Sequence, residues 1–388
     1  MIAPAARAVR VYLPCTGLGR VTRGFETVTR ECARALQGQA GVHVTVFGGG
    51  RALKAEERRV PSLGRFSAAA TALGAVLRRD PYFIEQTSFA LAFLPALIAG
   101  DPDVVYFSDL NLGNACWHWR RLSGQRFRLL YYNGGPTTRP FTRCDLVQQV
   151  SPEHLQAAVE RGESRRRQVL LPHGMAIPET FIPETDDERR RTRLALGIPA
   201  EGPVVLSVGN LESAHKRMDY VVRETAALPG PRPHLLLLGA ENEHTPAVRA
   251  LADALLGRDG CTMRTVERSL ALSAYRAADA FVLASLHEGF GMAHLEALAA
   301  GLPCAAHDSP TTRYIYGPHA RLADLRVPGA LTPLLASALG ERASSGGAAA
   351  HDRHAWARDH FSWDHLAGRY VELFRACADG RAPQFAGD

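Results

Sequence analysis

One stretch in the second half of the 388-residue chain, residues 279–301, constrains the fold more than any other. Residues 280–286 form a short apolar run, which is typical of a buried parallel strand. A turn with glycines at 289 and 291 follows, and residues 292–300 are rich in helix formers before Gly301. The stretch therefore predicts a strand, a glycine turn and a helix, as in doubly wound α/β domains.

This predicted unit is suited to bind an anion. Glycines let the backbone approach a ligand, and the free N–H groups of the first helical turn point at it. Two carboxylates lie beside the turn, Glu288 within it and Glu296 eight residues later in the helix. Carboxylates repel phosphate but accept hydrogen bonds from hydroxyl groups. A ligand with a diphosphate centre and hydroxyls at both ends, such as a nucleotide sugar, satisfies both features.

Glu288 and Glu296 form the Glu-x7-Glu pattern of retaining glycosyltransferases with the GT-B fold, and the whole stretch resembles the signature of glycosyltransferase family 4. The resemblance implies that Glu288 contacts the donor sugar and that Glu296 contacts the ribose. It also implies an α/β fold of two Rossmann-like, doubly wound domains facing each other across a cleft. The alternative is an ordinary doubly wound domain with two solvated glutamates, which the flanking residues of the motif disfavour.

The length of the chain suits two domains of ordinary size. We predict an N-terminal, acceptor-binding domain at 1–182 and a C-terminal, donor-binding domain at 183–363, with a linker at about 178–183. The tail is apolar at helical spacing. By resemblance, a final helix at about 364–378 packs back on the first domain.

Composition favours a cytoplasmic protein. The longest apolar run, residues 89–99, contains Pro95 and is too short to cross a bilayer, and residues 1–10 lack the order of a signal peptide. Seven cysteines without Cys-x2-Cys spacing indicate reduced thiols. The net charge is +6, but the arginine clusters lie beside acidic residues and are interpreted as solvated helix faces. We therefore expect neither a nucleic-acid partner nor membrane association.

The first domain offers weaker candidates. A strand at 9–14 precedes a turn containing Gly17, Gly19 and Arg20, and the resemblance places this turn near the donor phosphate and the acceptor. Two further predicted strands end at Asp109 and Asn133, and many family members carry a histidine at one of these two strand ends. The candidates for acceptor binding are Asp109, Asn133 and His173, and Asn133 is also a catalytic candidate that would hold a sugar hydroxyl.

The second domain carries the predicted phosphate clamp. Residues 210–220 resemble the family's Gly-Arg…Lys-Gly-x-Asp segment, in which an arginine and a lysine bind the donor diphosphate. Lys216 matches the lysine, whereas Asn210 stands where arginine is usual, so the second cation is either missing or supplied by Arg217. A cation is needed because the leaving group gains negative charge as the glycosidic bond breaks.

By resemblance, the chain is a retaining enzyme that transfers a sugar from a nucleoside diphosphate to an acceptor hydroxyl without a metal. Asp101-Pro-Asp103 has the spacing of the metal motif of GT-A enzymes, but it precedes a strand and is interpreted as a capping loop. The expected acceptor is a soluble natural-product or oligosaccharide intermediate. A homodimer is compatible with the sequence. The catalytic candidates are Glu288, Lys216 and Asn133. The donor-binding candidates are Gly17, Gly19, Arg20, Asn210, Lys216, Arg217, Glu267, Gly289, Phe290, Gly291, Met292 and Glu296.

Three alternatives to this function remain. A sugar-nucleotide epimerase or phosphorylase would share the phosphate subsite. A nucleotide-sugar-binding relative without turnover is compatible with the departures at Asn210 and Asn133. A nucleic-acid binder is suggested only by the pI of about 9.1.

Overall fold

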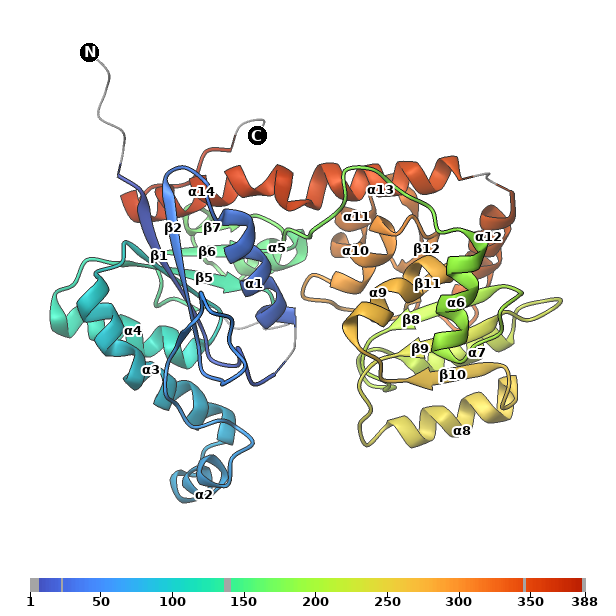
Figure 1. Cartoon of the computed structure of the whole chain (residues 1–388), viewed down its shortest axis with the longest axis horizontal. Helices are drawn as coiled ribbons and strands as arrows, with labels where there is room; N and C mark the ends of the chain where they lie inside the picture. Colours follow the sequence, from blue (N-terminus) through green and yellow to red (C-terminus); the bar gives the residue numbers. More distant parts are fainter. Residues whose placement is uncertain (1–6, 22–23, 136–140, 345–346, 386–388) are drawn as a thin grey trace, which may run out of the picture. The chain divides into compact units, whose positions relative to one another are not determined.

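The computed structural model describes residues 7–21, 24–135, 141–344 and 347–385. The chain divides into two compact units (Figure 1). Unit 1 combines Met1–Ala176 with Phe361–Asp388, and unit 2 is Ile177–His360. The domain boundaries predicted from the sequence lie a few residues further along the chain. Each unit is a parallel sheet with helices on both faces, which agrees with the predicted doubly wound α/β class.

In the described part of unit 1 the sheet has seven strands in the order β3-β2-β1-β4-β5-β6-β7. Its inner strands are near-continuous apolar runs because helices cover both faces. The strands are β1 (Val9–Cys15), β2 (Val42–Gly48), β3 (Arg58–Arg59), β4 (Val104–Phe107), β5 (Arg128–Asn133), β6 (Leu146–Gln149) and β7 (Gln168–Leu170).

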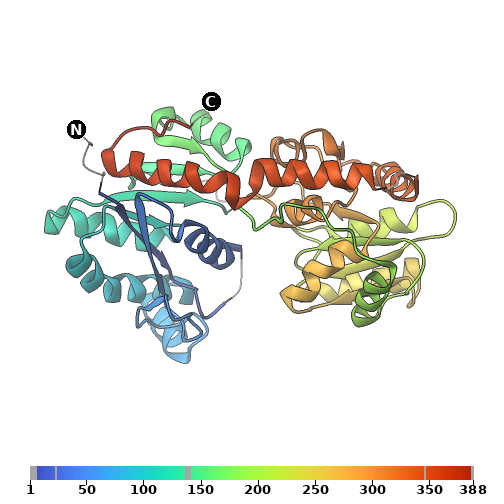
Figure 2. The same cartoon turned by 45° about the horizontal axis from the view of Figure 1, so that its top comes forward.

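The helices of unit 1 form two layers. Helices α1 and α14 contact each other and the strands β1 and β2 (Figures 1 and 2). Helices α3 and α4 pack together on a core that includes Phe47, Phe93 and Phe107. The helices are α1 (Gly24–Leu36), α2 (Ala68–Leu77), α3 (Pro81–Gly100), α4 (Leu110–Ser123), α5 (Pro152–Glu160), the 3-10 turn η1 (Arg165–Arg167) and α14 (Trp363–Asp379).

Across its described residues, unit 2 has a six-stranded parallel sheet in the order β10-β9-β8-β11-β12-β13. The strand order reverses between β8 and β11, and the crevice at the carboxyl ends of such a switch point is where open α/β sheets bind ligands. The strands are β8 (Val204–Val208), β9 (His234–Leu238), β10 (Cys261–Arg264), β11 (Ala280–Leu283), β12 (Cys304–His307) and β13 (Ala320–Ala323).

Two groups of helices surround the sheet of unit 2. Helix α7 contacts α8 and α12, whereas α9 contacts α6 and α10. The helices are α6 (Asp186–Leu196), α7 (Met218–Ala226), α8 (Thr245–Leu256), α9 (Arg268–Ala277), α10 (Met292–Ala299), α11 (Pro310–Tyr316), the 3-10 turn η2 (Gly317–His319), α12 (Leu331–Ser344) and α13 (Ala348–Phe361).

The apolar tail of the chain forms two helices. The sequence predicts a final helix at about 364–378, and α14 spans Trp363–Asp379. Ser362 is extended, with φ −72° and ψ 149°, and separates α13 from α14. Its hydroxyl accepts a hydrogen bond from the His365 N–H and so caps α14. Met175 pairs with Ser362 in a parallel bridge, which ties the start of α14 to unit 1.

Candidate functional site

The glycine turn between β11 and α10 forms as the sequence predicts. The strand ends at Leu283, so residues 284–291 are all available to the turn. Gly291 is the N-cap residue of α10 with φ 87°, a conformation that favours glycine. A Cβ atom there would lie 2.7 Å from Cδ2 of His294. No side chain caps the helix, so its first N–H groups remain available to an anion.

Lys216 and Glu288 form an ion pair beside this turn. The Lys216 Nζ lies 2.5 Å from Oε1 of Glu288, and the two side chains are 17% and 11% exposed. Gly209, at the end of β8, leaves room for the lysine stem, because a Cβ atom there would lie 3.0 Å from it. Burial raises the pKa of Glu288, but attraction to Lys216 and their hydrogen bond outweigh burial and hold the pKa below its ordinary value. The carboxylate is therefore ionised at neutral pH.

Glu296 is fixed by two donors from α9. Tyr275 donates its hydroxyl to Oε2 at 2.7 Å, and Arg268 donates to Oε1 at 2.9 Å. A carboxylate accepts about four hydrogen bonds, so two hydroxyl groups of a ligand can still bind. Neither Tyr275 nor Arg268 was predicted from the sequence. Their spacing of seven residues, two helical turns, places them on one face of α9 and could have indicated them.

His294 is the third polar side chain at this turn, and the sequence analysis did not single it out. It is 1% exposed, and its Nδ1 lies 2.6 Å from the hydroxyl of Tyr316. Its Nε2 is buried, and no partner for it is found in the part of the chain that the structure describes. Burial lowers the pKa of His294 to about 4, so the ring is neutral at pH 7. The available signal was that His294 and Glu296 are the two polar residues of α10.

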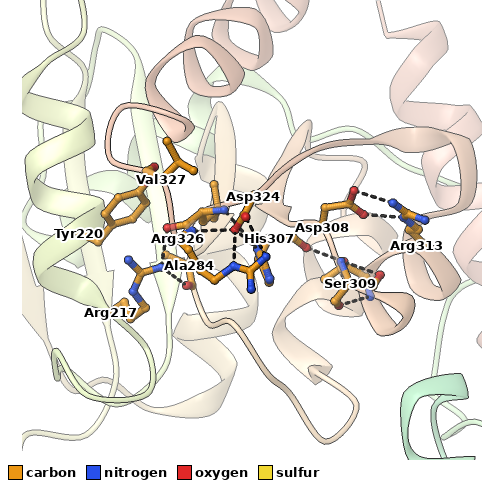
Figure 3. Close-up of polar contacts among 12 residues, drawn as sticks. Arg217, Tyr220, Ala284, His307, Asp308, Ser309, Arg313, Asp324, Arg326 and Val327 are labelled. Atoms are coloured by element: carbon orange, nitrogen blue, oxygen red, sulfur yellow. Dashed lines mark hydrogen bonds and ion pairs between the residues drawn. The ribbon is translucent and has the colours of Figure 1, made fainter. Parts of the chain in front are cut away.

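Arg217 is held by the protein itself. Its φ of 51° is in the left-handed region, and Nη1 donates to the carbonyl of Leu325 at 2.8 Å. The guanidinium carbon lies 4.4 Å from the ring centroid of Tyr220 (Figure 3). These contacts brace the loop after β13, and the role of Arg217 as a second phosphate cation stays a prediction. The side chains of Asn210 and Glu267 are exposed, and their predicted roles are likewise untested.

The loops after β12 and β13 are tied together beside Arg217 (Figure 3). The Leu325 N–H donates to Nδ1 of His307 at 3.2 Å. Arg326 donates to both carboxylate oxygens of Asp324 at 2.8 Å, and these hydrogen bonds lower the pKa of Asp324 to about 2. The carboxyl end of the sheet is therefore rimmed by ordered polar loops.

In unit 1 the predicted glycine turn is present, and Arg20 has a structural partner. Gly19 has φ 78°, and a Cβ atom at Gly17 would lie 2.2 Å from Oε1 of Glu26. Arg20 donates to Glu85 at 2.9 Å, and Glu85 is fully buried and also pairs with Arg65. Arg20 thus neutralises a buried carboxylate, and its role toward the donor stays a prediction.

Asp109 is also engaged within unit 1. It is 7% exposed and accepts hydrogen bonds from the hydroxyls of Thr16 at 2.6 Å and Tyr82 at 2.5 Å. The amide of Gln86 lies 3.5 Å from the same carboxylate. These contacts hold the Asp109 carboxylate beside the Gly17–Gly19 turn. The predicted role of Asp109 in acceptor binding stays a prediction.

Asn133 and His173 are buried near the ends of β5 and β7. Asn133 donates to the side chain of Gln149 at 2.7 Å, and its Oδ1 is buried, with no hydrogen-bond partner among the described residues. His173 is bonded to the hydroxyl of Tyr132, and burial lowers its pKa to about 3. His173 is therefore a neutral ring at physiological pH. Their roles in acceptor binding stay predictions.

Comparison with known families identifies the second unit. Residues 188–330 match the family described as glycosyl transferases group 1. The match covers most of unit 2. The matched segment of this glycosyl transferase domain contains Lys216, Glu288 and Glu296, so the resemblance seen in the sequence is confirmed.

Curated relatives cover part of the chain. Mannosylfructose-phosphate synthase of Agrobacterium fabrum is 30% identical over 204 residues, which are 47% of this chain and 42% of that protein. D-inositol 3-phosphate glycosyltransferase of Mycobacteroides abscessus is 32% identical over 213 residues, which are 52% of this chain and 45% of that protein. The chain spans about half the length of these curated relatives.

Solved structures match nearly the whole chain. Sucrose-phosphate synthase from Thermosynechococcus elongatus matches with a TM-score of 0.76 and 20% identity, over 95% of this chain and 98% of that one. Anabaena HepE, solved in complex with UDP and glucose, matches with a TM-score of 0.70 and 15% identity, over 95% and 100%. At these identities the likeness establishes the fold, and it confirms the predicted GT-B class.

Proposed function

We propose that the protein is a retaining glycosyltransferase that moves a sugar from a nucleoside-diphosphate donor to an acceptor hydroxyl. The observation that carries the proposal is the Lys216–Glu288 ion pair, which lies beside the uncapped N-terminus of α10. An ammonium group and free backbone N–H groups together bind a diphosphate and stabilise it as it departs.

The ion pair also explains how the two ends of the donor are recognised. The Lys216 ammonium is paired with the carboxylate of Glu288. A bound diphosphate provides Lys216 with a second anionic partner, and Glu288 then accepts hydrogen bonds from sugar hydroxyls. Glu296, already oriented by Tyr275 and Arg268, accepts the ribose hydroxyls. HepE, a structural relative of the chain, was solved with UDP and glucose, which are the two component parts of such a donor.

The finer parts of the proposal concern the acceptor, the stereochemistry and the metal. The acceptor is a soluble natural-product or oligosaccharide intermediate, the anomeric configuration of the donor is retained, and no metal is required. Metal independence follows from charge, because Lys216 and the amides of α10 supply the positive field that a cation would otherwise supply. The protein acts in the cytoplasm.

Donor binding is tested by thermal shift with UDP, GDP, ADP, dTDP and their sugars. The chain contains two lysines, Lys54 and Lys216, so Lys54→Ala is a matched control for Lys216→Ala. We expect one nucleotide to stabilise the native protein and Lys54→Ala equally, and Lys216→Ala much less. Equal stabilisation of all three proteins would contradict the clamp.

Transfer is tested by product analysis with the donor so identified. A glycoside with the donor's anomeric configuration, formed only when acceptor is present and unchanged by EDTA, is the expected result. Donor conversion without acceptor would indicate an epimerase, and loss of activity in EDTA would contradict metal independence. Activity on lipid vesicles alone would contradict a soluble acceptor.

A further inference from the structure

Helix α2 is apolar on all sides and yet exposed. Its sequence, Ala-Ala-Ala-Thr-Ala-Leu-Gly-Ala-Val-Leu, has Thr71 as its one polar side chain. A helix that is apolar all round is normally buried in a core or in a membrane. Here the buried residues are Ala70 and Gly74 alone, one narrow stripe, and α2 packs on α3. In Figure 1 α2 lies at the foot of unit 1.

The exposed side chains of this helix are large. Val76 is 78% exposed, Leu77 52% and Leu73 41%, and Phe66, just before the helix, is 82% exposed. We call these four residues the α2 patch. Exposed apolar side chains scattered singly are ordinary, but a run of them on one element marks an interaction surface.

Basic residues flank the α2 patch in the sequence. From residue 58 to residue 79 the chain has five arginines and no acidic residue. Arg65 is used internally, because it pairs with Glu85 and lies over the ring of Tyr82. The other four, Arg58, Arg59, Arg78 and Arg79, are exposed. In the sequence, the patch therefore lies between two pairs of exposed arginines.

Helix α3 supports the patch from within unit 1. Among the described helices it is the one long and apolar enough to cross a membrane. Its window of highest hydropathy is only 39% buried, but Phe89, Phe93 and Leu97 belong to the core cluster of unit 1. Glu85, with its two arginine partners, is also on α3. We therefore interpret α3 as a core helix, and α2 as the element that lies on the surface.

We propose that the α2 patch docks on an anionic lipid membrane. Apolar side chains would enter the interface between headgroups and acyl chains, and Arg78 and Arg79, which directly follow α2, would meet the anionic headgroups. A second copy of the chain suits the patch less well, because a two-fold contact places the same basic flanks opposite each other. The proposal goes beyond the proposed transferase activity and does not depend on it. It also departs from the absence of membrane association expected from composition.

The proposal is tested by flotation of the full chain with vesicles of phosphatidylcholine alone or mixed with phosphatidylserine. We expect binding to the mixed vesicles, weaker binding to the neutral ones, and loss of binding at high salt. The double variant Phe66→Ser, Val76→Ser should bind the mixed vesicles at least about tenfold more weakly than the native chain does. The matched control, Leu122→Ser with Ile182→Ser, changes side chains that are 83% and 74% exposed elsewhere, and should bind as the native chain does.

A second variant keeps the test independent of folding. Arg78→Gln with Arg79→Gln alters exposed side chains only, and should lower binding to the mixed vesicles by about tenfold or more. Binding of the native chain to neither vesicle, or equal loss in the control variant, would overturn the proposal. Concentration-dependent dimers that Phe66→Ser, Val76→Ser abolishes, without vesicle binding, would make a second copy the occupant.

Discussion

The Lys216–Glu288 pair illustrates why an ion pair can persist where an apolar contact would be more stable. Both side chains are mostly buried, and removing two charges from water costs more than such a pair usually returns. The pair is therefore weak evidence for stability and better evidence for a ligand. A bound diphosphate would replace Glu288 as the partner of Lys216, and a sugar hydroxyl would replace Lys216 as the partner of Glu288.

The buried ring of His294 predicts a stability change with pH. Its pKa is about 4 in the folded chain and about 6.5 when unfolded, so the unfolded chain binds the proton more tightly. The free energy of unfolding does not change with the titration of His294 above pH 6.5. It falls as the pH drops from 6.5 to 4, because the unfolded chain takes up the proton first. At pH 5 the loss is about 2 kcal/mol. The free energy of unfolding, measured in urea at pH 7 and at pH 5, should fall between these pH values by about 2 kcal/mol less in His294→Leu than in the native chain.

The native chain supplies the control for this measurement. Other buried histidines, such as His173, also destabilise the folded chain in acid, and they are the same in both proteins. The difference between the two pH dependences therefore isolates His294. Parallel curves for the native chain and the variant would show that His294 is not a buried neutral ring.

At the residue scale, the sequence predicted which side chains belong to the candidate site better than it predicted which residues they contact. Lys216 and Glu288 could each be predicted from motifs, but their contact joins residues 72 positions apart and depends on neighbouring strands. Arg20 followed a glycine turn and resembled a phosphate cation. The structure pairs it with Glu85, a buried carboxylate in α3 that no local pattern links to the turn, and its role toward the donor stays a prediction.

At the element scale, the glycine turn and the final helix were predictable, and the break just before that helix was not. Strand, turn and helix at 280–299 follow from local composition, because glycine and helix formers act within a few residues. The tail is apolar at helical spacing on both sides of Ser362, so periodicity alone does not place the break between α13 and α14. The break comes from the cap at Ser362, together with its bridge to Met175.

The cap of α14 gives a prediction for this element. Replacing Ser362 by alanine removes the acceptor for the His365 N–H, and loss of such a cap costs about 1 kcal/mol. We expect Ser362→Ala to lower the midpoint of urea unfolding by a corresponding amount. Ser362→Thr keeps the hydroxyl and is the control. If both variants unfold as the native chain does, the serine does not cap α14.

At the scale of the whole molecule, unit 1 is assembled from the two ends of the chain. The hydroxyl of Tyr370, in α14, donates to the carbonyl of Pro172 at 3.0 Å and accepts from the Gln148 amide at 2.9 Å. Tyr370, Leu373 and Phe374 are fully buried. The first 176 residues therefore lack part of their own core until the last helix is added.

A chain that ends after His360 tests this dependence. It lacks α14, and each large apolar side chain removed from the core costs about 1.5–3 kcal/mol, against a total stability of about 5–15 kcal/mol. We expect hydrogen exchange to show unit 1 unprotected and unit 2 still protected. Protection of β1 and β4 in the shortened chain would contradict this account.

The most direct test of the donor site uses the scarcity of lysine. Lys54 and Lys216 lie in different units, so an amine-reactive reagent followed by mass spectrometry reports on each, with Lys54 as the internal reference. We predict that the nucleoside diphosphate which stabilises the protein slows modification of Lys216 and leaves Lys54 unchanged. Unchanged modification of Lys216 with the nucleotide bound would contradict the central claim, that Lys216 holds the donor diphosphate.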